Sequence, residues 1–407
     1  MSAPADTATK IPPHVPAELV WEGSYDAFTA EGDDPFLAVS RFHELPPVIW
    51  VTDVTFGRPG WVCTRFDSVS EGFIDHARFS AERPGMIGEL VGEPVRLNPI
   101  EIDPPAHHGY RKNLNPVFTP KAVGAMGDAV KATCESLIAS FADKGRCDFV
   151  RDFAIPFPTY VFLDLMGMPR DLAQQFLDWE DELMRAPDMM DRVKAARGVY
   201  HYLKAHKDSQ LANPVNELNR AIVTGTFDGR PLDHLEMMGM YYVLYVGGLD
   251  TVYSTLGWIM RHLATHPEDQ TALRVNPELI PAAIEEFCRA FSVVNTHRHV
   301  AVDCEFHGAP LRKGDELHLP IALANRDPAV FADPHRIDFT RKPRHITFGT
   351  GTHSCLGIHL AKRELRTVVE AFLAHFRNIR PDPDQRDSYH TGRTFGMDSL
   401  PLLFDRA

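Results

Sequence analysis

The most informative part of this chain is the stretch Phe348-Gly349-Thr350-Gly351-Thr352-His353-Ser354-Cys355-Leu356-Gly357. One cysteine stands in a turn bracketed by glycines, which allow backbone conformations and close approaches that a side chain would block. An apolar pattern typical of a helix follows from Ile358 to Phe376. The partial positive charge of a helix N-terminus favours a thiolate, and an exposed loop around a thiolate suits a metal ligand. A buried, inert cysteine in a turn is the plain alternative.

Length and composition narrow the class of protein. Hydrophobic residues are 44% of the 407, enough for a sizeable core, and we expect a single domain over residues 1–407 with an irregular N-terminal arm over residues 1–30. The apolar runs are too short to cross a bilayer, and residues 1–20 show no secretory signal core, so we expect a cytoplasmic protein. A net charge of −13 argues against nucleic acid as a partner.

Cysteine and histidine spacings exclude the common linear metal motifs. The six cysteines include no C-x-x-C pair, and their scatter in a long chain indicates a reducing compartment. The twenty histidines show no H-E-x-x-H or similar spacing. No conventional zinc site is therefore predicted.

A second unusual stretch lies in the middle of the chain. The apolar pattern predicts one long helix from Leu235 to Leu263, yet Gly247 and Gly248 lie inside it and cost about 1 kcal/mol each relative to alanine. Close approach of a flat cofactor, or a local opening of the helix ladder, would account for them. Asp250 and Thr251 follow these glycines, and both can be explained without a functional role. Asp250 would then form a surface salt bridge, and the Thr251 hydroxyl would bond to the carbonyl four residues earlier.

Together these two stretches resemble motifs of the cytochrome P450 family. Residues 348–357 match its haem-binding loop at every fixed position, and Gly-Gly-x-Asp-Thr at 247–251 resembles its oxygen-activation motif, most closely in the bacterial soluble class I camphor-hydroxylase group. The resemblance implies a mainly α fold with small β-sheets, a triangular helix-rich prism around a buried haem b. It makes Cys355 the axial thiolate ligand of the iron. Asp250 and Thr251 would be the catalytic residues, which orient the oxygen being activated and relay protons to it.

Further residues align with the family's haem-binding positions. His107 and Arg111 follow Asp103-Pro104-Pro105, are four apart and share a helical face, where the family binds a haem propionate. An ordinary solvated helix face is the plain alternative for this pair. The resemblance assigns haem binding to Cys355, His107, Arg111, Arg298, His353, Phe348 and Gly349.

A Glu-x-x-Arg pair resembles the structural lock of the family. Glu286 and Arg289 are three apart on a predicted helix and face the same way. The family joins this pair to a downstream arginine, and Arg336 stands at the matching place. We expect these three residues to be structural and not catalytic.

Periodicity and turn residues predict the remaining elements. We expect helices over residues 35–44, 122–142, 153–165, 172–184, 190–211 and 277–291, strands at 48–51 and 61–63, a hairpin within 306–315, and a loop over 83–99.

The substrate pocket departs from the camphor-hydroxylase pattern at one position. The tyrosine that anchors the substrate in that group falls on Val95 here. An apolar pocket selects its substrate by shape, and one methylene group changes the discrimination between two substrates by only about 1–3 kcal/mol. We expect a small hydrophobic, terpenoid-like substrate, such as an ionone-like norisoprenoid, and not camphor. The aligned pocket residues are Met86, Val95, Val243, Val246 and Val294.

Electrons must come from another protein, because no flavin or nicotinamide segment is visible. We expect a [2Fe–2S] ferredoxin with an NADH-dependent ferredoxin reductase, docked by basic residues on the cysteine face. These basic residues are Arg111, Lys112, Arg341, Lys342, Arg344, Lys362 and Arg363. The alternative is that they are scattered, solvated charges with no docking role.

Two alternative functions are considered beside the monooxygenase. One is a peroxygenase that uses H2O2, and the other is a non-catalytic haem-thiolate sensor or carrier.

Overall fold

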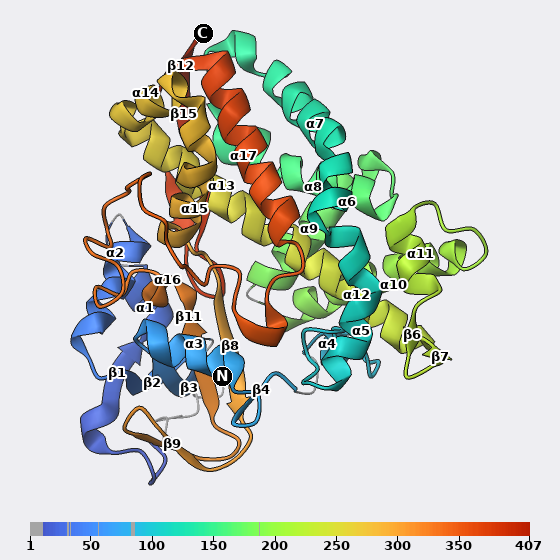
Figure 1. Cartoon of the computed structure of the whole chain (residues 1–407), viewed down its shortest axis with the longest axis vertical. Coiled ribbons are helices and arrows are strands. Elements are labelled where there is room, and N and C mark those ends of the chain that lie inside the picture. Colours follow the sequence, from blue (N-terminus) through green and yellow to red (C-terminus); the bar gives the residue numbers. More distant parts are fainter. Residues whose placement is uncertain (1–10, 31, 33, 56, 83–85, 187) are drawn as a thin grey trace, which may run out of the picture.

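The computed structural model describes residues 11–407 apart from residues 31, 33, 56, 83–85 and 187. Helices form most of the molecule, and the largest sheet lies at one end of it (Figure 1). This is the mainly α architecture with small β-sheets that the resemblance predicts. Within the described residues, none of the helices is long and apolar enough to span a bilayer.

The largest sheet has six strands in the order β1-β2-β3-β11-β8-β4. β11 pairs parallel with β3 and antiparallel with β8, and so joins the N-terminal hairpin to a strand far along the chain. Buried side chains such as Trp50, Trp61 and Leu317 form a separate core on this sheet. The strands are β1 (Val20–Ser24), β2 (Val48–Thr55), β3 (Arg58–Cys63), β11 (Glu316–Pro320), β8 (Asn295–Val300) and β4 (Phe79–Ser80).

The expectation of an irregular arm over residues 1–30 is wrong for its second half. β1 pairs parallel with β2, and helix α1 (Tyr25–Thr29) buries Tyr25 almost completely. The rings of Trp21 and Phe28 both pack edge-on against Phe42. These contacts with Phe42, which lies outside the segment, hold it in place, and they could not be predicted from the sequence of residues 1–30 alone. Residues 1–10 lie outside the described part of the chain.

The other strands form small sheets and hairpins. The predicted hairpin within 306–315 is confirmed, displaced by a few residues, as β9 and β10. The strands are β9 (Cys304–Phe306) with β10 (Ala309–Leu311), β5 (Arg146–Asp148) with β15 (Pro401–Arg406) and β12 (Phe376–Pro381), β13 (Ser388–His390) with β14 (Gly396–Ser399), and β6 (Thr226–Phe227) with β7 (Arg230–Pro231).

Most predicted helices are present, and three segments before the long central helix differ from the expectation. The helix predicted over 122–142 is divided at Met126, which lies between the weak helix formers Gly124 and Gly127. The helix predicted over 153–165 starts in a π-helical turn, Val150–Ala154. The loop predicted over 83–99 contains a helix, α4, because Ile87, Leu90 and Val91 bury one face. The helices are α2 (Pro35–Ser40), α3 (Phe66–Ile74), α4 (Met86–Val91), α5 (Ala106–Leu114), α6 (Pro120–Ala125), α7 (Gly127–Ala139), α8 (Pro156–Met166), α9 (Ala173–Arg185), α10 (Met189–Gln210), α11 (Glu217–Val223), α12 (His234–Gly248), α13 (Asp250–Thr265), α14 (Pro267–Val275), α15 (Ile280–Ala290), α16 (Ile321–Ala324) and α17 (Ile358–His375).

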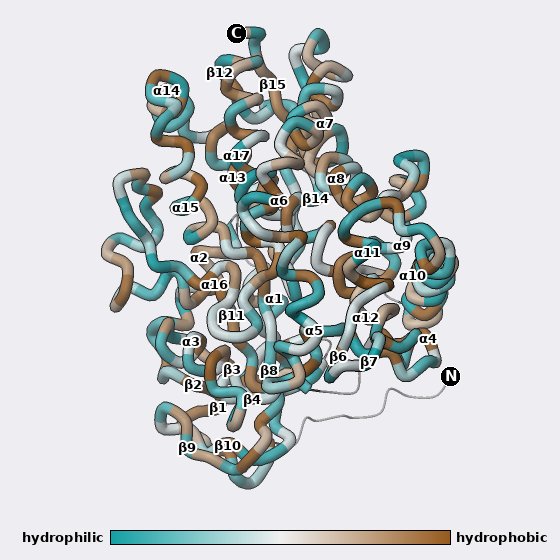
Figure 2. The backbone as a smooth tube through the Cα atoms, turned by 45° about the vertical axis from the view of Figure 1, so that its right-hand side comes forward, coloured by the Kyte–Doolittle hydropathy of each residue, from teal (hydrophilic) through white to brown (hydrophobic). Residues whose placement is uncertain are grey.

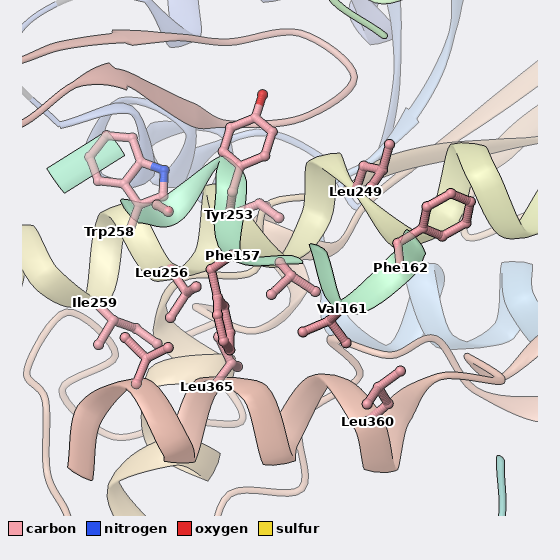
Figure 3. Close-up of a cluster of buried hydrophobic side chains, with 14 of the residues drawn as sticks. Phe157, Val161, Phe162, Leu249, Tyr253, Leu256, Trp258, Ile259, Leu360 and Leu365 are labelled. Carbon is pink, nitrogen blue, oxygen red and sulfur yellow. The ribbon is translucent and has the colours of Figure 1, made fainter. Parts of the chain in front are cut away.

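The main core lies between α8, α13 and α17. Side chains of these helices point toward one another, for example Phe157 of α8, Ile259 of α13 and Leu365 of α17 (Figure 3). The outer helices, such as α10, alternate between hydrophilic and hydrophobic residues (Figure 2). This packing holds α13 and α17 in fixed positions, and the two unusual sequence motifs lie at the N-terminal ends of these helices.

Candidate active site

Backbone hydrogen bonds fix the cysteine loop. The Gly349 N–H donates to the carbonyl of Ile346, and the Cys355 N–H donates to the carbonyl of Phe348, both at 2.8 Å. Gly349 and Gly351 have φ values of +67° and +70°, in the left-handed region that favours glycine. The predicted need for glycine at these two positions is therefore confirmed. The loop ends at Gly357, the N-cap of α17.

The Cys355 thiol is accessible although protein atoms crowd around it. Burial raises its pKa and outweighs the backbone N–H of Gly357 and the charge of Arg111, both of which lower it. The helix N-terminus therefore lowers the pKa of the thiol in the expected direction, but burial outweighs this effect in the free side chain. A coordinated metal ion deprotonates a thiol outright, and so supplies the stabilisation that the loop lacks by itself.

Four basic side chains gather near the cysteine loop, from three separate elements. The rings of His107 on α5 and His353 in the loop lie 4.5 Å apart. Burial, followed by Arg298, His107 and Arg111, lowers the pKa of His353 to about 3. Burial, followed by Arg111 and His108, lowers the pKa of His107 to about 4. The structure therefore brings together the predicted propionate-binding residues, and the charges of the arginines disfavour protonation of the histidines.

The histidines of this cluster are arranged for an anionic ligand. Both ring nitrogens of His107 and Nε2 of His353 are buried and have no hydrogen-bond partner among the described residues. Buried polar atoms normally have partners. The carboxylates of haem propionates would accept these hydrogen bonds and neutralise the neighbouring arginines. The residues present therefore fit a haem.

The helix predicted as continuous from Leu235 to Leu263 is two helices, α12 and α13, with Leu249 between them. Local opening of the ladder, one of the two explanations for the paired glycines, is observed. Gly247 is exposed between half-buried neighbours, and a Cβ there would meet nothing within 4 Å. A Cβ on Gly248 would lie 3.3 Å from the ring of Phe162. Gly247 thus borders open space, and Gly248 permits close packing.

Asp250 and Thr251 begin α13 at this break. Asp250 is only 2% exposed, so the alternative of a surface salt bridge is wrong. Thr251 is half-buried, and its Oγ1 lies 3.4 Å from the carbonyl of Gly247. The predicted hydrogen bond from Thr251 to the carbonyl four residues earlier is thus observed, but its length is at the upper limit for a hydrogen bond. The hydroxyl can therefore turn to another acceptor at little cost.

Comparisons with known proteins agree with this geometry. The family model described as Cytochrome P450 matches residues 185–405. A "Probable cytochrome P450 127A1" of Sinorhizobium fredii is 34% identical over 97% of each chain. The crystal structure of cytochrome P450 CYP101C1 aligns with a TM-score of 0.86 and 31% identity, covering 97% of this chain and 100% of that one. CYP101J2 aligns with a TM-score of 0.87 and 31% identity over 98% and 100%.

This chain belongs to the cytochrome P450 family. It is a bacterial-type P450 similar to the camphor-hydroxylase group, and it is a monooxygenase with the P450 fold. The cofactor of the family is a thiolate-ligated haem. The steroid C26-monooxygenase of Mycobacterium tuberculosis strain H37Rv is 33% identical over 75% of this chain and 79% of its own.

The structural lock of this P450 uses a different arginine from the one predicted. The side chains of Glu286 and Arg289 are fully buried and joined by two hydrogen bonds of 2.8 and 2.9 Å. The third member is Arg341, whose Nε donates to Glu286 at 3.1 Å. The side chain of Arg336 is exposed, and only its backbone carbonyl takes part, as an acceptor from Arg289. The expectation for Arg336 is therefore wrong.

The structure also shows the burial of the predicted pocket residues. Among the pocket residues, Val243, Val246 and Val294 are half-buried and Val95 is fully buried, whereas the side chain of Met86 lies outside the described part of the P450.

One residue near the site was not predicted from the sequence. The ring of Phe73 lies 5.2 Å from the Arg298 guanidinium and so helps to position it.

Proposed function

We propose that this P450 hydroxylates a small hydrophobic, terpenoid-like substrate of the norisoprenoid class, with O2 and with electrons from a [2Fe–2S] ferredoxin. The observation that carries the proposal is a set of half-buried valines, two of which precede the open position at Gly247 on helix α12. Val243 and Val246 are half-buried on the same helix, and Val294 is half-buried on the segment before β8. The camphor-anchoring hydroxyl is missing, since its position is Val95. Such a lining retains a substrate by shape and apolar contact.

The proposed roles of the haem-binding residues follow from their places. Cys355 Sγ ligates the iron, with Phe348 and Gly349 in the loop that carries it. His107, Arg111, Arg298 and His353 bind the propionates, which the buried nitrogens without partners support. When bound, the haem supplies the reduction of O2 and the insertion of one oxygen atom into the substrate.

Asp250 and Thr251 are proposed to control protons at the break between α12 and α13. The Thr251 hydroxyl holds its present bond to Gly247 only weakly and can instead donate a hydrogen bond toward the open space. The buried Asp250 carboxyl lies next to it in sequence and can pass a proton into the site. Because Asp250 and Thr251 lie on α13, they can deliver protons without a titratable residue among the apolar side chains of the proposed substrate pocket. The presence of both residues favours O2 over H2O2 as the oxidant.

The substrate class is tested by titrating α-ionone, β-ionone, camphor and a C27 steroid against the haem-loaded P450. Water that leaves the iron on substrate binding shifts the haem spectrum. We expect an ionone to bind at least tenfold more tightly than camphor, because no tyrosine hydroxyl is present to hold the camphor ketone. Tighter binding of camphor would contradict the proposal. Tighter binding of the steroid, a substrate class suggested by the steroid C26-monooxygenases, would contradict it equally.

The ferredoxin is proposed to dock on fewer basic residues than the sequence indicates. Arg341 is bound to the buried Glu286, and Lys362 forms a 2.8 Å ion pair with Glu285. Arg111 is half-buried beside the cysteine loop. The charges that remain exposed can attract an acidic partner in the otherwise acidic protein. They belong to Lys112, Lys342, Arg344 and Arg363.

Charge reversal at Lys342 and Arg344 is expected to slow reduction by an acidic ferredoxin at least tenfold at low salt. The effect should shrink as salt is added, because salt screens the attraction between exposed charges. Stopped-flow reduction under carbon monoxide measures the rate. The matched control reverses Arg58 and Lys313, which are exposed on strand β3 and before strand β11. Unchanged rates for K342E/R344E, or equal slowing in R58E/K313E, would contradict docking at this face.

A further inference from the structure

One face of the β8–β11 ladder gathers metal-ligating side chains that the proposed function does not use. His299 lies opposite Glu316, and His297 lies opposite His318, across the two antiparallel strands. Alternate residues of a strand point to the same face of the sheet. These four side chains therefore share one face, and Arg298 points to the other.

Their donor atoms are close together. One ligand atom each from His297, His299 and Glu316 lies within 4.8 Å of the other two. Nε2 of His318 is 3.6 Å from the Glu316 carboxylate, and its ring is 5.5 Å from that of His297. Zinc bonds of about 2.0–2.1 Å in a tetrahedron place ligand atoms roughly 3.3 Å apart. The observed separations are up to 4.8 Å, so the side chains would have to turn toward a bound ion.

The neighbouring strand makes room for this arrangement. A Cβ on Gly60 of β3 would lie 2.9 Å from the His318 ring, so the glycine permits the imidazole to occupy its place. Nε2 of His318 is buried and has no hydrogen-bond partner among the described residues. A buried polar atom without a partner is costly, and a bound cation would satisfy it. His297, His299 and Glu316 are half-buried, which leaves access from solvent.

We propose that His297, His299, Glu316 and His318 form a binding site for a divalent transition-metal ion of the zinc class, separate from the haem. Three imidazoles and one carboxylate are a donor set that zinc accepts, whereas calcium and magnesium prefer oxygen ligands. A search for linear histidine motifs misses the site because its residues meet only through the strand register, as H-x-H on β8 and E-x-H on β11.

Equilibrium dialysis of the haem-loaded protein against micromolar Zn²⁺ tests the proposal, with zinc and haem iron counted by mass spectrometry. We expect one zinc per haem, and at least a ~100-fold weaker affinity in H297A/H299A, since loss of even outer-shell partners costs 10–100-fold. The control is H375A, which removes the imidazole of an isolated His375–Glu135 pair. It should leave the stoichiometry unchanged. Absence of stoichiometric zinc in the wild type, or its retention in H297A/H299A, would overturn the proposal.

A second measurement needs no variant and so does not depend on the folding of one. Diethyl pyrocarbonate modifies accessible imidazoles, and bound zinc blocks the reaction. Zinc is expected to protect His297 and His299, which are half-buried, at least fivefold and to leave His375 unprotected. Equal modification of the three residues with and without zinc would also overturn the proposal.

Discussion

Replacing Arg289 by methionine is expected to lower the free energy of unfolding by about 3–5 kcal/mol. Arg289 and Glu286 are both 0% exposed, so the change leaves the Glu286 carboxylate buried with one partner fewer. It also removes the donor to the backbone carbonyls of Asn325 and Pro334, at 2.9 and 2.8 Å. These two carbonyls lie on the segment that leads to the cysteine loop, so haem retention should fall together with stability.

Urea unfolding followed in parallel by far-ultraviolet circular dichroism and by the haem band measures this effect. The matched control is Arg366→Met, which breaks an exposed Arg366–Glu370 pair on α17 and should cost less than about 1 kcal/mol. If Arg289→Met costs no more than the control, the buried network does not carry the structural role assigned to it.

Replacing Thr251 by alanine is expected to reduce product formed per NADH at least tenfold, while NADH consumption and haem content persist. General acid–base groups typically contribute 10²–10⁴-fold, and the hydroxyl at the helix break is proposed to direct the protons. Without it, electrons should leave as hydrogen peroxide. Because Thr251 is half-buried and weakly bonded, the change should disturb the fold little.

Product, peroxide and NADH are measured together in the system reconstituted with ferredoxin and its reductase. Thr251→Ser keeps the hydroxyl and should restore most of the product yield, which separates loss of the hydroxyl from loss of packing. An undiminished yield in Thr251→Ala would remove Thr251 from the proton path. Equal losses in the serine and alanine variants would assign the effect to the missing methyl group.

Features that depend on local backbone geometry could be predicted from the sequence. The positive φ values of Gly349 and Gly351 follow from the loop itself, and so the loop conformation matches the expectation. The apolar periodicity of α12 and α13 predicted a helix, but not its break at Leu249. That break depends on what packs around Gly247 and Gly248, including Phe162 from another helix.

Features that depend on contacts between distant segments could not be predicted in the same way. Arg336 and Arg341 both follow the Glu-x-x-Arg pair, and only the path of the intervening coil brings Arg341 to Glu286. The burial of Tyr25 requires the strand β1 to pair with β2. The histidine cluster likewise arises from the register between β8 and β11.

Ligation of the haem iron by the Cys355 sulfur is tested most directly by the absorption spectrum of the reduced, carbon-monoxide-treated protein. We expect the far-shifted Soret band of a thiolate-ligated haem in the wild type and in Cys288→Ser, which alters a buried cysteine elsewhere. The Cys355→His variant should bind haem without that shifted band. A shifted band that persists in Cys355→His would contradict ligation by Cys355 and every role assigned around it.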